Sequence, residues 1–431
     1  MAPKKDKNEK EYGEKTEPWE PVHLKPVSSD TITIETDACT LVVWSKHTIP
    51  GTQLHPATCH TGACVVISKP KNDAGKIYEL LSRYDHPNLL KPIGIWEDPN
   101  KVGNAYLAFE EVHGCVKQKR EEIFSMDGTS IYGFSDSGFK IFRGIFSAVN
   151  YVNNHYKKDA ESTSSDTTHP LYAMNLVDST IFYRISAANE LQAVLGDFHI
   201  SNPAALRNLQ TRSGKPRDPT HEDIEKYNWN STGDYLSGFY KKDDANEEMK
   251  HLAMFLKGQT VKEVMYDELL WEPGLWEADL KMEYIREIWW HVDRQRDKNK
   301  TMKLKDTDNG KLLSAKPPLG IIDCILKLLE AKHDKIVENT LMDSVEHLRD
   351  HIVAHQDLSY LAYQGPKDDV GVTKAIIERY VQKTKGDYMI TLIRQIRPLG
   401  WIAQSPLVKD KGSYMDCFYQ LKRVENLKQE D

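Results

Sequence analysis

Residues 171–201 read LYAMNLVDSTIFYRISAANELQAVLGDFHIS, and the interpretation of the whole chain starts from this stretch. It contains two apolar runs bounded by polar residues, a pattern that predicts two short strands joined by a turn. The second run ends in Gly196-Asp197-Phe198-His199. An Asp in this position is either a simple turn residue or an oxygen ligand for a divalent cation.

The pair Asp197-Phe198 resembles the start of the metal-binding Asp-Phe-Gly motif of protein kinases. In that family a preceding loop carries a catalytic Asp, a Lys and an Asn, and the same frame here gives Asn175, Val177 and Thr180. The resemblance implies that the ability to catalyse phosphoryl transfer has been lost. The amide of Asn175 is a very poor base, Val177 cannot neutralise phosphoryl charge, and Thr180 is a weak ligand for a second Mg²⁺. Asp197 remains as a strong oxygen ligand.

Upstream segments follow the order of strands and helices in a kinase. Strand patterns cover 31–44, 65–69, 92–96 and 105–112, and helix patterns cover 75–84 and 139–156. After His199, a polar segment reaches residue 246 without the Ala-Pro-Glu anchor of a kinase activation segment, and Glu248 then resembles loosely the start of a buried kinase helix.

The kinase resemblance implies a vestigial nucleotide site. Lys69, at the end of a buried strand pattern, takes the place of the phosphate-pairing lysine; otherwise it is a solvated strand-end residue. Ile77 stands where the family has the Glu that pairs with this lysine, so the ion pair is absent unless Glu79 replaces it from another helix face. Phe109 and Glu110 take the gatekeeper and first hinge positions.

The segment 45–61 is interpreted as a loop in the place of the kinase phosphate cover. It has no G-x-G-x-x-G, so it lacks the glycines that let backbone amides approach phosphate closely. Four soft ligands lie in it or just beyond it, namely His55, Cys59, His60 and Cys64. Such side chains bind zinc, but their spacing matches no zinc module.

A second resemblance begins at Glu272-Pro273-Gly274-Leu275-Trp276-Glu277, which leads into an amphipathic helix pattern over 280–292. This junction resembles the one in the family of RNase L and the unfolded-protein-response kinase/endoribonuclease. In that family a kinase fold continues into a small helical ribonuclease domain, the KEN domain. The segments 344–356 and 372–396 are similar to its later helices, although their apolar spacing suits any helical bundle.

KEN domains cleave RNA without metal, using a His and a Tyr with an Arg-Asn pair nearby. An ungapped overlay places Val353-Ala354 at the Arg-Asn pair, Leu358 at the His and Thr340 near the Tyr, which implies an inactive nuclease. The candidate ribonuclease residues that remain are His347, His351, His355 and Tyr360. In a helix the three histidines would share one face, where imidazoles can act as base and acid, bind a metal or form surface hydrogen bonds.

Composition narrows the class of protein further. The 431 residues are enough for two or three domains, and the net charge of −7 argues against broad coating of nucleic acid. No apolar run has membrane-spanning length, and the first residues, MAPKKDKNEKEYGEK, lack the apolar core of a signal peptide. Six cysteines without a pairing pattern indicate reduced thiols and a soluble cytoplasmic or nuclear protein.

The sequence therefore predicts an α+β fold, with a bilobal protein-kinase-like fold followed by a small all-helical KEN-like domain. The expected boundaries are a disordered tail at 1–25, an N-lobe at 26–112, a C-lobe at 113–276, the KEN-like domain at 277–400 and a C-terminal tail at 401–431. ATP or ADP with Mg²⁺ would be at most a weak ligand, held by Lys69, Glu110 and Asp197, and no cofactor is required.

The expected function is that of a pseudokinase–KEN-like regulatory protein. It would act as a homodimer, or as a heterodimer with a related kinase/KEN protein. No association with a membrane is expected. Two alternatives are an endoribonuclease that cleaves RNA and a divergent ATP-binding protein kinase.

Overall fold

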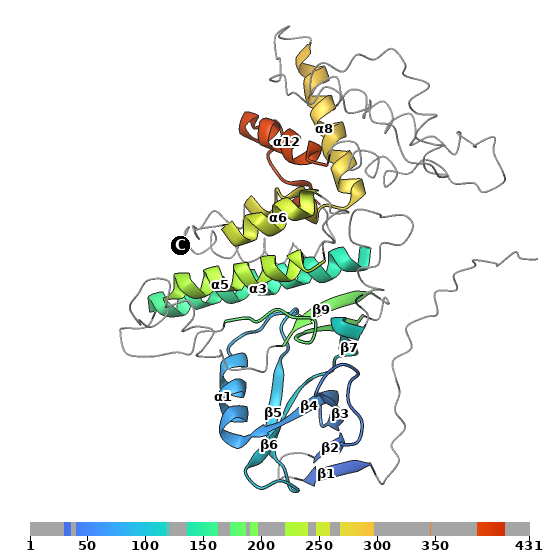
Figure 1. Ribbon diagram of the computed structural model, residues 1–431, viewed down its shortest axis with the longest axis vertical. Helices are drawn as coiled ribbons and strands as arrows, with labels where there is room; N and C mark the ends of the chain where they lie inside the picture. Colours follow the sequence, from blue (N-terminus) through green and yellow to red (C-terminus); the bar gives the residue numbers. More distant parts are fainter. Residues whose placement is uncertain are drawn as a thin grey trace, which may run out of the picture.

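The chain has a mixed α+β fold. The computed structural model describes residues 30–35, 40–118, 120, 136–162, 173–186, 190–196, 220–239, 247–258, 268–296, 345 and 386–409. A six-stranded antiparallel sheet forms one end, α3 and α5 lie across the middle, and α6, α8 and α12 follow beyond them (Figure 1).

The N-terminal sheet has the strand order β1-β2-β3-β4-β6-β5. Its strands are β1 (Thr31–Glu35), β2 (Thr40–Trp44), β3 (His55–Cys59), β4 (Gly62–Pro70), β5 (Pro92–Glu97) and β6 (Asn104–Glu110). The strand patterns at 65–69, 92–96 and 105–112 are confirmed, and the pattern at 31–44 folds as the two paired strands β1 and β2.

The prediction of a loop over 45–61 is wrong in its second half. That half forms β3, which pairs with β4 from His55 opposite Val66 to Cys59 opposite Gly62. Gly62 adopts φ of +112°, a backbone conformation that glycine takes readily, and this lets the chain reverse between the two strands. The sequence pattern did not predict β3, because the strand is short and lacks an apolar alternation. Its pairing with β4 supplies its stability.

Alternation along β4 divides the core between the two faces of this sheet. Val65 and Ile67 belong to the large core, whereas Cys64 and Val66 belong to a smaller cluster with residues from β1, β2 and β3. Successive side chains of a strand point to opposite faces, so Lys69 lies on the same face of the sheet as Val65 and Ile67. The same face is covered by α1 (Lys71–Leu81), whose Ile77 lies in the large core. The helix predicted at 75–84 is thus present, shifted toward the N-terminus.

A second, three-stranded sheet has the order β7-β8-β9, with β7 at Gly114–Cys115, β8 at Ile181–Ile185 and β9 at Leu191–Leu195. β8 and β9 form the antiparallel pair predicted from the 171–201 stretch. The segment after α1 joins this sheet, because Leu90 N–H donates to the carbonyl of Leu195 at 2.9 Å and Leu195 N–H donates to that of Asn88 at 2.8 Å. These bonds connect the two sheets.

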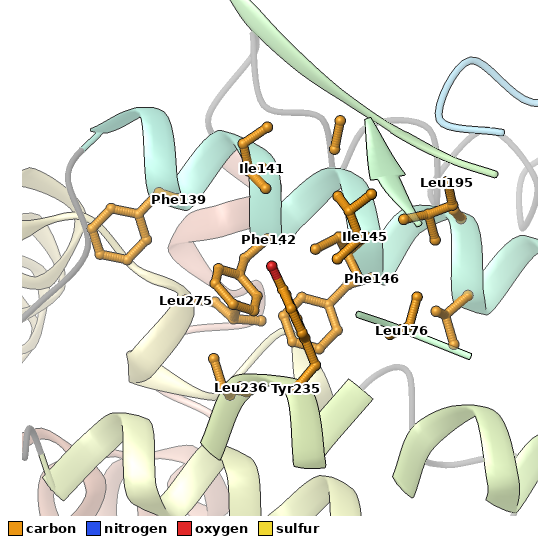
Figure 2. Close-up of a cluster of buried hydrophobic side chains, with 14 of the residues drawn as sticks. Phe139, Ile141, Phe142, Ile145, Phe146, Leu176, Leu195, Tyr235, Leu236 and Leu275 are labelled. Atoms are coloured by element: carbon orange, nitrogen blue, oxygen red, sulfur yellow. The ribbon is translucent and has the colours of Figure 1, made fainter. Parts of the chain in front are cut away.

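The helical part is built on α3 (Asp136–Ser162), which confirms the long helix predicted at 139–156. Against it packs α5 (His221–Ser237), and α6 (Glu247–Gly258) packs against α5. Figure 2 shows Phe142 and Phe146 of α3 beside Tyr235 of α5, within one buried cluster. The polar sequence from 200 to 246 gave no sign of α5, which begins with a capping box at Thr220 and buries polar residues such as Asn228 and Thr232 beside its apolar ones.

Beyond α6 come η2 (Pro273–Leu275) and α8 (Ala278–Arg296), so the amphipathic helix predicted there is confirmed. The chain then contributes α12 (Tyr388–Ile396), η3 (Arg397–Leu399) and α13 (Pro406–Lys409). Apolar side chains of η2, α8, α12 and α13 join the large core, among them Leu275, Met389 and Leu407. Among the described residues no helix is long and apolar enough to cross a bilayer.

His86 is held as a neutral ring between α1 and β5. Asn88 N–H donates to His86 Nδ1 at 3.1 Å, so Nδ1 is an acceptor and Nε2 carries the proton toward Ser147 Oγ, also at 3.1 Å. The ring of Tyr151 lies 4.8 Å away. Burial lowers the pKa of His86 from 6.5 to about 4, and the nearby carboxylate of Asp85 opposes this shift only in part.

This lowered pKa predicts acid sensitivity. Because the folded-state pKa is below the unfolded value, His86 contributes stability that is complete above pH 6.5 and is lost as the pH falls toward 4. We expect a loss of about 2 kcal/mol over that window, as the ring keeps some contact with solvent. Urea unfolding at several pH values measures it. The His86→Gln variant should be less stable at neutral pH but lose less on acidification; an equal loss in both proteins would assign the effect to other groups.

Candidate functional site

The segment 173–180 is a closed turn at the junction of the sheets and the helical part. Thr180 Oγ1 donates to the carbonyl of Asn175 at 2.8 Å and accepts from Val177 N–H at 3.1 Å. The Thr180 carbonyl in turn accepts from Gly196 N–H at 3.0 Å, next to the end of β9. The Thr180 hydroxyl, which would correspond to the second metal ligand of a kinase, therefore closes its own turn.

Side chains of α5 fix the orientation of this turn. Asn228 Oδ1 accepts from Met174 N–H at 2.7 Å, and Ser231 Oγ accepts from Leu176 N–H at 3.1 Å. Met174 and Leu176 are buried, while Asn175 is exposed and the side chain of Val177 is 40% exposed. An amide and an apolar side chain thus occupy the surface where phosphoryl transfer would need a base and a cation.

The carboxylate of Asp178, which the sequence analysis did not single out, is held by two partners. Arg120 Nη1 contacts Asp178 Oδ2 at 2.6 Å, and the Tyr235 hydroxyl donates to Oδ1 at 2.9 Å. Arg120 also donates to the carbonyl of Gly238 and lies over the ring of Phe239. Burial, and then the charge of Asp178, raise the pKa of Tyr235, which keeps its proton in this contact. Both carboxylate oxygens of Asp178 thus hold the turn against Arg120 and α5.

Lys69 is half-buried at the end of β4, opposite Ala105 of β6. Ile77, in the position where a kinase has glutamate, is 2% exposed and packs in the core. The alternative partner, Glu79, contacts Arg83 at 2.8 Å one helical turn away. Among the described residues no carboxylate forms an ion pair with Lys69. The Lys–Glu pair that positions phosphates in an active kinase is therefore not formed.

Glu110, at the end of β6, is paired with the second sheet. Its carboxylate accepts from Arg184 Nη2 at 2.7 Å, and Arg184 Nε donates to the carbonyl of Glu111 at 2.8 Å. His113 N–H donates to the carbonyl of Tyr183, and burial lowers the pKa of the His113 ring. The polar groups of this connection thus bind β8, which fixes the angle between the two sheets.

The β2–β3 loop, residues 45–54, folds onto the segment that follows β6. The loop is braced by Thr52, whose Oγ1 donates to the carbonyl of Ile49 and accepts from Leu54 N–H. At its tip, Gly51 has φ of +71°, and a Cβ there would lie 2.9 Å from Cys115 Sγ. Leu54 is buried in the large core. The loop therefore packs as an apolar cover and presents no cradle of glycine amides.

The four soft ligands of this region do not assemble. His55 Nδ1–H donates to the carbonyl of His47 at 2.6 Å, and Cys59 Sγ contacts Thr61 Oγ1 at 3.0 Å. Cys64 is buried, and burial, together with Cys59, raises its pKa. Within the described ranges no three His, Cys, Asp or Glu side chains are placed to hold a metal ion.

The other predicted site residues lie outside the described residues. They are the metal-ligand candidate Asp197 and the ribonuclease candidates His347, His351, His355 and Tyr360. The helix predicted at 344–356 falls in the same range, where the structure describes Val345 alone, as a buried residue.

No protein-family model and no curated protein matches this chain. Its function is therefore inferred from the geometry of the described residues and from the motifs in its sequence.

Proposed function

We propose that this protein is a non-catalytic, kinase-like regulatory protein that acts by binding a partner chain, either a second copy or a related kinase/KEN protein. The order of elements supports a kinase-like N-lobe: an antiparallel sheet with a lysine on β4, a helix directly after it, two further strands, and then a long helix before a hairpin. A KEN-like continuation after Trp276 remains part of the proposal on the sequence resemblance.

The observation that carries the proposal is the environment of Lys69. A kinase needs the ammonium held by a glutamate so that it binds the phosphates of ATP. Here Ile77 packs in the core and Glu79 is paired with Arg83. Asn175 and Val177, which are both exposed, support the proposal further. On the kinase resemblance they stand where the catalytic base and the catalytic lysine would be, and neither side chain can act as a base or carry a positive charge.

We expect ATP with Mg²⁺ or Mn²⁺ to leave the melting temperature unchanged, because a ligand stabilises a protein only as far as it binds the folded state. Thermal shift of the full chain over a titration of nucleotide is the measurement, with a phosphorylation assay beside it. Lys69→Ala is the control. A large Mg²⁺-dependent shift that disappears in this variant would show a working nucleotide site and favour the divergent-kinase alternative.

A second measurement addresses partner binding. Sedimentation of the purified chain over a range of concentrations should show a species of twice the monomer mass of 49.4 kDa, or a complex with a related chain when one is added. A strict monomer that binds no such chain would contradict the proposed mode of action while leaving the nucleotide result unaffected.

A further inference from the structure

Three side chains from separate segments meet between α6 and α12. They are His251 of α6, Glu272 just before η2, and Arg394 of α12. His251 Nδ1 lies 2.8 Å from Glu272 Oε2, and His251 Nε2 lies 2.5 Å from Arg394 Nη2. We call this group the polar latch. It joins residues that are 143 positions apart in the chain.

The two contacts allow one protonation state of His251. An arginine has donors and no acceptor, so Nε2 must accept the bond from Arg394. The ring proton then sits on Nδ1 and is donated to the carboxylate of Glu272. A neutral ring satisfies both neighbours, whereas a protonated ring would have a hydrogen on each nitrogen and would place a second cation against Arg394.

Several charged groups on the described adjoining elements are paired with one another, such as Lys257 of α6 with Asp234 of α5 at 2.7 Å. On α6, Lys250 contacts Glu247 and Glu248 contacts Lys281 of α8, each at 2.6 Å. In the segment before η2, Glu268 binds Arg397. Within the described ranges, the carboxylate of Glu272 and the guanidinium of Arg394 are thus the charged groups that contact the ring, one at each ring nitrogen.

The latch lies beside a short helix that is held mainly by its apolar face. The buried residues of α12 are Tyr388, Met389, Ile390, Leu392, Ile393 and Ile396. With nine residues, α12 is too short to be stable without its contacts. The bond from Arg394 to His251 is therefore a polar attachment on the exposed side of a helix that depends on docking.

We propose that His251 is a proton-sensitive switch for the polar attachment of α12 to α6. At neutral pH the ring accepts from Arg394 and the latch is closed. When the ring gains a proton on Nε2, the bond to Arg394 is lost and the two cations repel, while the bond to Glu272 persists. The attachment of α12 then loosens. This inference stands independently of the proposed function, since it needs neither nucleotide nor a partner chain.

The test is hydrogen exchange of the α12 amides in the full chain, corrected for intrinsic exchange rates. The exchange is measured at about pH 7.5 and at about pH 5.5, which span the range in which histidine side chains in general change charge. We expect the protection of α12 to fall about tenfold at the lower pH, the size of effect of one hydrogen bond to a charged group, while α3 changes little.

Two substitutions at the same position separate the latch from general acid effects. In His251→Gln, the side-chain amide can donate to Glu272 and accept from Arg394 without titrating, so α12 should stay protected at both pH values. In His251→Lys, the fixed charge should leave α12 loosened at both. Arg83→Met, which removes a partly exposed arginine that follows α1 and pairs with Glu79 of that helix, is the matched control and should behave as the parent chain. A tenfold fall that persists in His251→Gln, or no fall in the parent chain, would overturn the proposal.

Discussion

Lys281→Met is expected to destabilise the protein by about 3–5 kcal/mol, because it leaves a buried carboxylate without its counter-ion. Lys281 Nζ lies 2.6 Å from Glu248 Oε2, and the two side chains are 2% and 0% exposed. The pair links α8 to the first turn of α6. Equilibrium unfolding in urea gives the free energy, and the midpoint should fall without a change in slope.

The double variant Glu248→Leu/Lys281→Met tests the physical reason. Removing both charges leaves an apolar contact, so most of the lost stability should return. Lys250→Met is the matched control on α6, since Lys250 forms an exposed pair with Glu247 and should contribute less than about 1 kcal/mol. If the single and double variants were equally unstable, packing rather than the unpaired charge would be responsible.

Elements with a continuous apolar pattern were predictable from the sequence. β4 has four consecutive buried residues, β6 has five, and α3 has an apolar face several turns long. The pattern failed at β3 and α5. β3 is a short strand stabilised by its neighbours on both sides, and α5 carries polar residues such as Asn228 that bind the 173–180 turn. In both elements the stabilising contacts are distant in sequence.

The candidate site shows the same division. The sequence resemblance predicted that Ile77 cannot form an ion pair with Lys69, and the structure adds that Ile77 packs in the core and that Glu79 pairs with Arg83. The partners of Asp178 and Glu110 could not be predicted from the sequence, because they are distant in the chain. Arg120 is 58 residues from Asp178, and Arg184 is 74 residues from Glu110. Any of several arginines and carboxylates would have satisfied the sequence pattern, and only the fold selects the pairs.

Arg143→Met should be the second large loss of stability, at about 3 kcal/mol. Arg143 lies on α3 with its side chain 4% exposed, and its Nη1 contacts Glu277 Oε1 at 2.8 Å. Its Nη2 donates to the carbonyl of Leu275 at 3.1 Å, so one guanidinium holds both ends of the short segment between η2 and α8. Met keeps much of the apolar stem but removes both bonds and leaves a buried carbonyl without this donor.

Lys140→Met, one helical turn earlier, gives the matched comparison. Lys140 contacts Glu190 at 2.7 Å, but both partners are exposed to solvent, so its loss should cost less than about 1 kcal/mol. Urea unfolding of both variants beside the parent chain measures the difference. Glu277→Gln should cost less than Arg143→Met, because Gln can still accept the bond from Nη1 and the Leu275 carbonyl keeps its donor. Equal effects of Arg143→Met and Lys140→Met would mean that burial adds nothing to this contact, and that apolar packing alone holds the segment before α8 against α3.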